Sequence, residues 1–85
     1  MDNKKDIFRY TVRDLIEILK DFPPDLPILT DGYESGYENL EPPKIIKVKY
    51  EPDKNYYDGE FQEPYKEEQE VFEVVLIQRK IRKIL

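Results

Sequence analysis

The hydrophobic pattern near the start of the chain predicts an amphipathic helix. Thr11 is a good N-cap, and Asp14 stands three residues later, at the position where a capping box usually has Glu or Gln. An apolar stripe follows at helical spacing, formed by Val12, Leu15, Ile16, Leu19 and Phe22. Pro23-Pro24 cannot continue the helix because neither ring carries an N–H. We therefore predict a helix over residues 11–22.

Three later segments have the pattern of β-strands. Residues 27–31 are mostly apolar and begin with a proline, which favours an edge strand or the start of a strand. Residues 44–50 alternate between apolar and lysine side chains, as half-buried strands do. Residues 71–79 are apolar on both faces, which indicates a central strand or a covered second face.

Together these elements predict a single α+β domain over residues 1–85. We expect two layers, with the N-terminal helix packed on a mostly antiparallel three-stranded sheet whose strands follow chain order. The strand residues expected beneath the helix stripe are Ile46, Val48, Phe72, Val74 and Leu76. One helix covers one face, so Ile45, Val75 and Ile77 should lie on the other. A loop or the tail could cover them there, or a homodimer or partner interface could form.

The segment 51–70 has no periodic signal and carries eight acidic and two basic side chains. It could be a long functional loop. It could equally extend the sheet as a hairpin, since Asp58-Gly59 is a hairpin-turn dipeptide flanked by aromatic residues. The sequence leaves both interpretations open.

Composition argues against catalysis. The chain has no cysteine and no histidine, which removes disulfides, the commonest general base and the commonest zinc ligand. No phosphate-binding glycine motif is present. We therefore expect neither an enzyme nor a cofactor. The start has no signal-peptide h-region and no apolar run could span a bilayer, so we expect a cytoplasmic protein that does not enter a membrane.

Charge is unevenly distributed along the chain, whose formal net charge is −5. Residues 31–73 carry a net charge of −8 and residues 74–85 a net charge of +4. The acidic stretch makes direct nucleic-acid binding unlikely, because it repels phosphates. The basic end (Arg79, Lys80, Arg82 and Lys83) could touch anionic lipid or nucleic acid, but pairing with the acidic loop 51–70 of the same molecule is favoured.

The most distinctive motif is the stretch 31–39, with two glycines, two tyrosines and three carboxylates. It suits a binding loop, because tyrosines give large, stiff contacts, and it equally suits a structural turn made by the glycines. Compared with the calcium-binding loop of an EF-hand, the stretch has the expected residues at the first position, Asp31, and the sixth, Gly36. Its third position is Tyr33 and its twelfth is Pro42, where a bidentate Glu is required.

Three motifs in the first half of the chain resemble a group of short uncharacterised bacterial and phage proteins. The motifs are TVRDLIEILK at 11–20, FPPDLPI at 22–28 and DGYESGY at 31–37. They match the group's LIxxL, PPDxPV and DGYExGY pattern, of which the last part is the most distinctive. The resemblance implies a bacterial or mobile-element setting and gives no residue a role. The segment 51–70 is longer than that pattern.

These features favour a small acidic protein-binding module. It could act as a phage or mobile-element modulator or inhibitor of a host nucleic-acid enzyme, with carboxylates imitating phosphates in a basic groove. The alternatives are a small-ligand or metal-binding domain using the loop 31–38, and a structural homo-oligomer. The candidate partner-binding residues combine carboxylates and tyrosines from two loops: Asp31, Tyr33, Glu34, Tyr37, Glu38, Tyr56, Tyr57, Asp58 and Tyr65.

Overall fold

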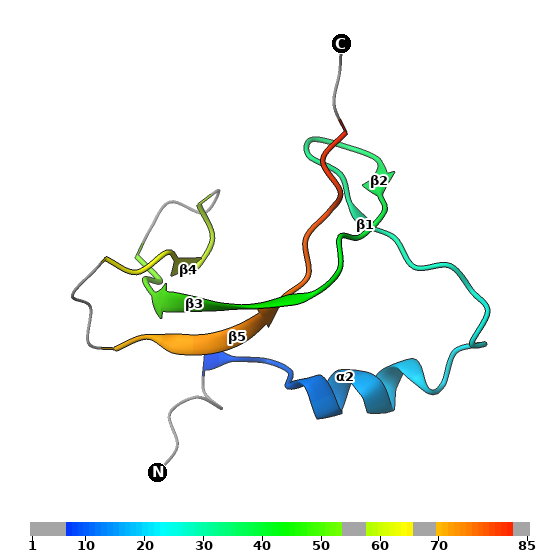
Figure 1. Cartoon of the computed structure of the whole chain (residues 1–85), viewed down its shortest axis with the longest axis horizontal. Helices are drawn as coiled ribbons and strands as arrows, with labels where there is room; N and C mark the ends of the chain where they lie inside the picture. Colours follow the sequence, from blue (N-terminus) through cyan, green and yellow to red (C-terminus); the bar gives the residue numbers. More distant parts are fainter. Residues whose placement is uncertain (1–6, 54–57, 66–69, 83–85) are drawn as a thin grey trace.

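The computed structural model describes residues 7–53, 58–65 and 70–82 (Figure 1). Its elements in chain order are α2 (Val12–Leu19), β1 (Thr30–Asp31), β2 (Tyr37–Glu38), β3 (Lys44–Tyr50), β4 (Phe61–Gln62) and β5 (Phe72–Leu76). Strand β3 pairs antiparallel with β4 on one side and β5 on the other, while β1 and β2 form a separate antiparallel pair. The predicted class, an α+β fold with a mostly antiparallel three-stranded sheet, is confirmed.

Helix α2 begins at the capping box that the sequence predicts. The Thr11 hydroxyl accepts a hydrogen bond from the Asp14 N–H at 3.1 Å, and the Asp14 carboxylate accepts one from the Thr11 N–H at 3.0 Å. The helix ends at Leu19, and Lys20 is its C-cap. After the helix the chain makes one tighter turn before the prolines. There the Asp21 N–H donates to the Ile18 carbonyl and the Phe22 N–H donates to the Leu19 carbonyl, three residues back in each case.

The three-stranded sheet is centred on β3, which spans the range that its alternating pattern predicts. Its register with β5 sets Val48 opposite Phe72 and Ile46 opposite Val74. The hairpin alternative for residues 51–70 is confirmed in that β4 pairs with β3, but Asp58-Gly59 lies within the connection 51–60 and does not form a two-residue turn. Phe61 pairs with Tyr50 in β4, and the Glu51 N–H donates to the Glu60 carbonyl at 2.7 Å.

The prediction that the first strand joins this sheet in chain order is wrong. Thr30 and Asp31 pair instead with Glu38 and Tyr37, inside the stretch expected to be a loop. The reason is chain connectivity, because a short turn brings these segments together at a lower entropic cost than a longer closure. The third strand of the main sheet is therefore β4.

The best-packed region is an aromatic cluster at one end of the sheet. The ring of Phe8 stacks on Phe61, with centroids 5.0 Å apart, and meets the edge of Phe72 at 5.4 Å. The ring centroid of Tyr50 lies 5.3 Å from that of Phe61, the residue opposite it in the sheet. Periodicity did not reveal the role of Phe8, because it precedes the predicted helix and belongs to no predicted element.

The helix does not bury its apolar stripe on the sheet, so the helix half of the predicted core is wrong. The sheet half is confirmed, since its predicted residues are buried or half-buried: Ile46, Val48, Phe72, Val74 and Leu76. Every α2 residue except Leu15 is exposed, and Val12 and Ile16 are 56 % and 51 % exposed. Only Arg9 and Tyr10 separate Phe8 from the N-cap. The helix therefore starts beside the aromatic cluster and runs away from the sheet (Figure 1). The proline-containing segment 22–29 then curves back to β1.

The result is a flat, open chain. It measures 40 × 39 × 21 Å, with a radius of gyration of 15.3 Å, against about 12 Å for a compact chain of this length. Among the described residues, only Val48 and Lys49, 7 % and 5 % exposed, are shielded from solvent. No helix in the described ranges is long and apolar enough to cross a membrane.

Candidate protein-binding site

The DGYESGY motif forms a tight hairpin between β1 and β2. The Gly32 N–H donates to the Gly36 carbonyl at 2.9 Å, which closes the turn. Gly36 has a φ of 73°, in the left-handed region that glycine adopts without steric cost. A Cβ at Gly32 would lie 2.5 Å from the Ser35 carbonyl oxygen, so this position also requires glycine. The two glycines therefore determine the shape of the hairpin, as the structural-turn interpretation predicts.

The chain beyond β5 lies against the base of this hairpin. Residues 77–82 run antiparallel to residues 39–41, with an isolated bridge between Leu40 and Arg79. The Lys80 N–H donates to the Asn39 carbonyl at 2.7 Å. Backbone pairing between segments so far apart in sequence ties the hairpin to the end of β5.

An ion pair strengthens this attachment. Arg82 Nε donates to Glu38 Oε2 at 2.9 Å, and the Glu38 side chain is only 20 % exposed. The prediction for the basic end was that it pairs with the acidic loop 51–70. In the described residues, Arg82 pairs with the β1–β2 hairpin instead, because the antiparallel path of residues 77–82 carries it there.

The two tyrosines of the motif extend from the hairpin into solvent. Tyr33 is 79 % exposed and Tyr37 is 73 % exposed. The Arg79 guanidinium lies 5.3 Å from the centroid of the Tyr33 ring, close enough for a cation–π contact. Asp31 and Glu34 are exposed beside them. The hairpin therefore presents two aromatic rings and two carboxylates on a backbone held by hydrogen bonds.

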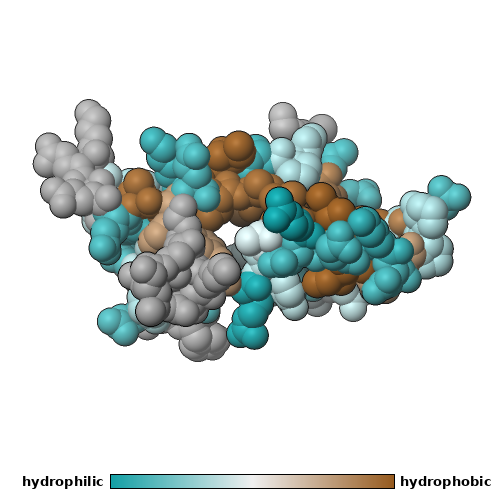
Figure 2. All heavy atoms as spheres, turned by 90° about the horizontal axis from the view of Figure 1, so that it is seen from below, coloured by the Kyte–Doolittle hydropathy of each residue, from teal (hydrophilic) through white to brown (hydrophobic). Residues whose placement is uncertain are grey.

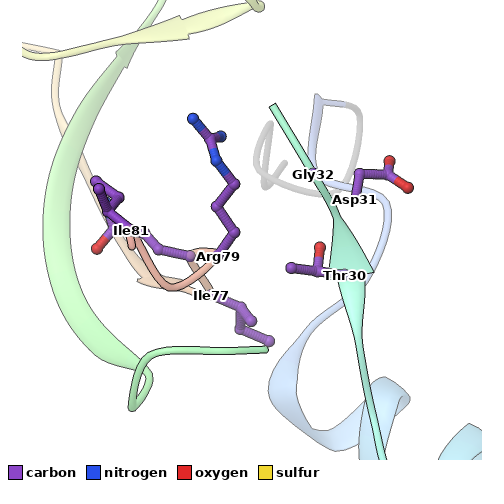
Figure 3. Close-up of a pocket in the computed structure, with 7 residues that line it drawn as sticks. Thr30, Asp31, Gly32, Ile77, Arg79 and Ile81 are labelled. Atoms are coloured by element: carbon purple, nitrogen blue, oxygen red, sulfur yellow. The ribbon is translucent and has the colours of Figure 1, made fainter. Parts of the chain in front are cut away.

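A groove of about 410 Å³ lies between β1 and the chain after β5 (Figure 3). It is lined by Thr30, Asp31, Gly32, Ile77, Gln78, Arg79 and Ile81. The side chains of Thr30 and Ile77 point towards each other across it, whereas the Asp31 carboxylate points away. Ile77 and Ile81 are exposed, so the groove is open.

The second predicted contact region is described only in part. Tyr56 and Tyr57 lie outside the described residues. Asp58 is exposed, and its carbonyl accepts a hydrogen bond from Gln62 Nε2 at 2.7 Å. Tyr65 is exposed as well, but the Lys49 ammonium lies 3.6 Å from the centroid of its ring. The described residues thus join Asp31, Tyr33, Glu34, Tyr37 and Glu38 in one hairpin, with Asp58 and Tyr65 in the segment that follows β3.

Lys49 is a further residue that sequence reasoning missed. The strand pattern placed it on the solvent side, yet its side chain is 7 % exposed and its ammonium lies 3.5 Å from Glu51 Oε2. Arg79 was considered only as part of a basic tail, whereas it contacts Tyr33 and lines the groove. The sequence around each residue does not reveal its role, because Lys49 contacts Tyr65 and Arg79 contacts Tyr33, and both neighbours are distant in sequence.

The metal-binding alternative for residues 31–38 gains no support from the geometry. Within the described ranges, no three acidic side chains come close enough together to hold an ion. Glu38 is paired with Arg82, and the third and twelfth positions of the would-be calcium loop remain Tyr33 and Pro42.

Comparison with known proteins gives no further guide to the role of this hairpin. No family model, no curated protein and no solved structure matches the chain. The suggested resemblance to short bacterial and phage proteins therefore stays a prediction.

Proposed function

We propose that this chain is a non-catalytic module that binds a protein partner through the β1–β2 hairpin. The observation that carries the proposal is the pair of exposed tyrosines, Tyr33 and Tyr37, on a hairpin held by residues 77–82. Tyrosine is enriched among residues that dominate binding energy, and a rigid backbone lowers the entropy lost on binding. A tyrosine left this exposed contributes little to the fold itself.

The charge of the chain favours a basic partner surface. Residues 31–73, which include the hairpin, have a net charge of −8. At the hairpin itself Arg82 pairs with Glu38 and Arg79 lies over Tyr33, so the attraction comes from the acidic residues of the stretch beyond the hairpin. Opposite potentials accelerate the encounter between two proteins. A bacterial enzyme that binds nucleic acid has such a basic groove, so a phage or mobile-element inhibitor acting in the cytoplasm is the most specific form of the proposal.

The test is affinity capture from bacterial lysate with the full chain, followed by measurement of the purified pair. Replacing both Tyr33 and Tyr37 with Ala should weaken binding at least about tenfold. Replacement with Phe keeps the rings and should retain most of the affinity. Tyr10→Ala is the control, because it removes an exposed tyrosine (61 % exposed) that lies outside both predicted contact regions.

Two results would reject the hairpin as the contact surface. One is unchanged affinity of the double Ala variant, and the other is an equal or larger loss for Tyr10→Ala. Salt gives an independent check on the charge argument. The association rate should fall as ionic strength rises, because screening removes the long-range attraction.

A further inference from the structure

Exposure alone does not show which tyrosine of the hairpin carries the partner contact. Apolar side chains are exposed over much of the molecule, as the view from below shows (Figure 2). Tyr33 and Tyr37 are 79 % and 73 % exposed, so the two hairpin rings hardly differ in this respect. They differ in what holds each ring in place.

The ring of Tyr33 is held from a part of the chain far away in sequence. Tyr33 lies in the turn that the hydrogen bond between Gly32 and Gly36 closes. The Arg79 guanidinium lies over its ring, 5.3 Å from the centroid, within the range of a cation–π attraction. Among the described residues, no aromatic ring stacks on Tyr37 and no cation lies over it.

The backbone that carries Arg79 is itself fixed by hydrogen bonds. The residues on either side of Arg79 each make a backbone bond with the segment 39–41, at 2.9 and 2.7 Å. Arg79 lies between these two bonds, in the bridge with Leu40, and is half-buried. Figure 3 shows its side chain extended and directed away from Ile77. The guanidinium is therefore brought to the Tyr33 ring by a well-supported segment.

A ring that is already held loses less conformational freedom when a partner binds. Ordering one free side chain at an interface lowers the affinity by up to about tenfold. An exposed cation–π contact favours the held conformation roughly two- to fivefold. Part of the ordering cost is therefore met for Tyr33 before the partner arrives, whereas Tyr37 meets all of it on binding.

We propose that Arg79 is a positioning residue that holds the Tyr33 ring ready for the partner, so that Tyr33 contributes more to binding than Tyr37. The inference rests on the proposed function, because the partner is the protein that the hairpin binds. Arg79 acts through the ring and does not need to touch the partner. The segment 77–82 then contributes to recognition as well as to the support of the hairpin backbone.

The conformation of Tyr33 in the free chain is the first test. Three-bond couplings between Hα and Hβ, measured by NMR, should show one dominant χ1 rotamer for Tyr33. Arg79→Met keeps the aliphatic stem but removes the guanidinium, so these couplings should become averaged. Arg79→Lys restores a cation and should recover part of the preference. Lys80→Met is the matched control, because it makes the same charge change at the next residue and should leave the couplings unchanged.

Affinity for the captured partner tests the consequence for binding. Tyr33→Ala should weaken binding at least about tenfold, and Tyr37→Ala less than about threefold. Arg79→Met should weaken binding roughly two- to fivefold in the otherwise wild-type chain. It should change nothing in the Tyr33→Ala variant, because the ring that it positions is gone. A merely structural role of Arg79 would lower the affinity of both backgrounds equally.

Failure of this inference can be told apart from failure of the proposed function. Three results would overturn the positioning role and leave the hairpin as the contact surface: equal Tyr33 couplings in the wild type and Arg79→Met, equal losses for Arg79→Met in both backgrounds, or a larger loss for Tyr37→Ala than for Tyr33→Ala. Unchanged affinity of the variant with both tyrosines replaced by Ala would reject the proposed function, and this inference with it.

Discussion

The aromatic cluster and the exposed apolar residues of the helical region contain similar side chains, but only the first are packed within the fold. We call the second group, Val12, Ile16, Leu19 and Phe22, the helix patch. Phe8 meets Phe61 and Phe72 with ring centroids 5.0 and 5.4 Å away. Phe22 leaves its ring 55 % exposed at the other end of the same helical region. Fourteen positions separate two phenylalanines, one inside the fold and one outside it.

The difference shows that apolar character alone does not decide burial. Phe8 enters the cluster because β3 and β4 place Phe61 opposite Tyr50, which creates an aromatic surface beside it. Phe22 is followed by Pro23-Pro24, which end the helix, and by a turn that the Leu26 N–H closes with the Pro23 carbonyl at 3.2 Å, so no strand of the sheet is placed against its ring. One region is stabilised by tertiary contacts within the chain, and the other by local capping alone among the contacts described.

The largest expected effect is on the aromatic cluster. Phe8→Ala should lower the free energy of unfolding by about 2 to 3 kcal/mol, since a half-buried ring and two aromatic contacts are lost. Phe22→Ala is the matched substitution in the helix patch and should cost about 0.5 kcal/mol, because that side chain is largely exposed. Urea denaturation measures both. If the two variants lost equal amounts of unfolding free energy, the proposed difference between the two regions would be wrong.

A smaller effect is expected at the start of the helix. Thr11→Ala removes the side chain that accepts from the Asp14 N–H and should cost about 1 kcal/mol. Because α2 lacks tertiary cover, this loss should appear as reduced helix content in far-ultraviolet circular dichroism. Thr11→Ser retains the hydroxyl and serves as the control. Unchanged helicity in the Ala variant would mean that packing, and not capping, holds the helix.

The smallest effect is expected at the ion pair between Arg82 and Glu38. Arg82 is 75 % exposed, and exposed pairs contribute about 0.5 kcal/mol or less. Arg82→Ala should therefore change the unfolding free energy slightly, and the change should vanish in high salt because screening removes the attraction. A loss above 1 kcal/mol (roughly the ceiling for exposed pairs) would place the hairpin among the tightly held regions.

Short-range patterns predicted the elements that depend on neighbours in sequence. The Thr11–Asp14 capping box and strand 44–50 are found where the sequence places them. The turn residues Gly32 and Gly36 shape a hairpin, although that stretch was expected to be a loop joined to the sheet. Within the candidate site, the tyrosines and carboxylates were identifiable by residue type, whereas Arg79 and Lys49 were not.

The sequence by itself determined the class of the fold, the helix start, the strand with alternating residues and the acidic charge of the middle of the chain. Each follows from the geometry or chemistry of residues close together along the chain. Only the tertiary structure decided that Phe8 joins the sheet, that residues 77–82 support the hairpin and that the helix patch faces solvent. These outcomes depend on which distant segments meet, and that is set by chain connectivity and by competition among many apolar surfaces of similar strength.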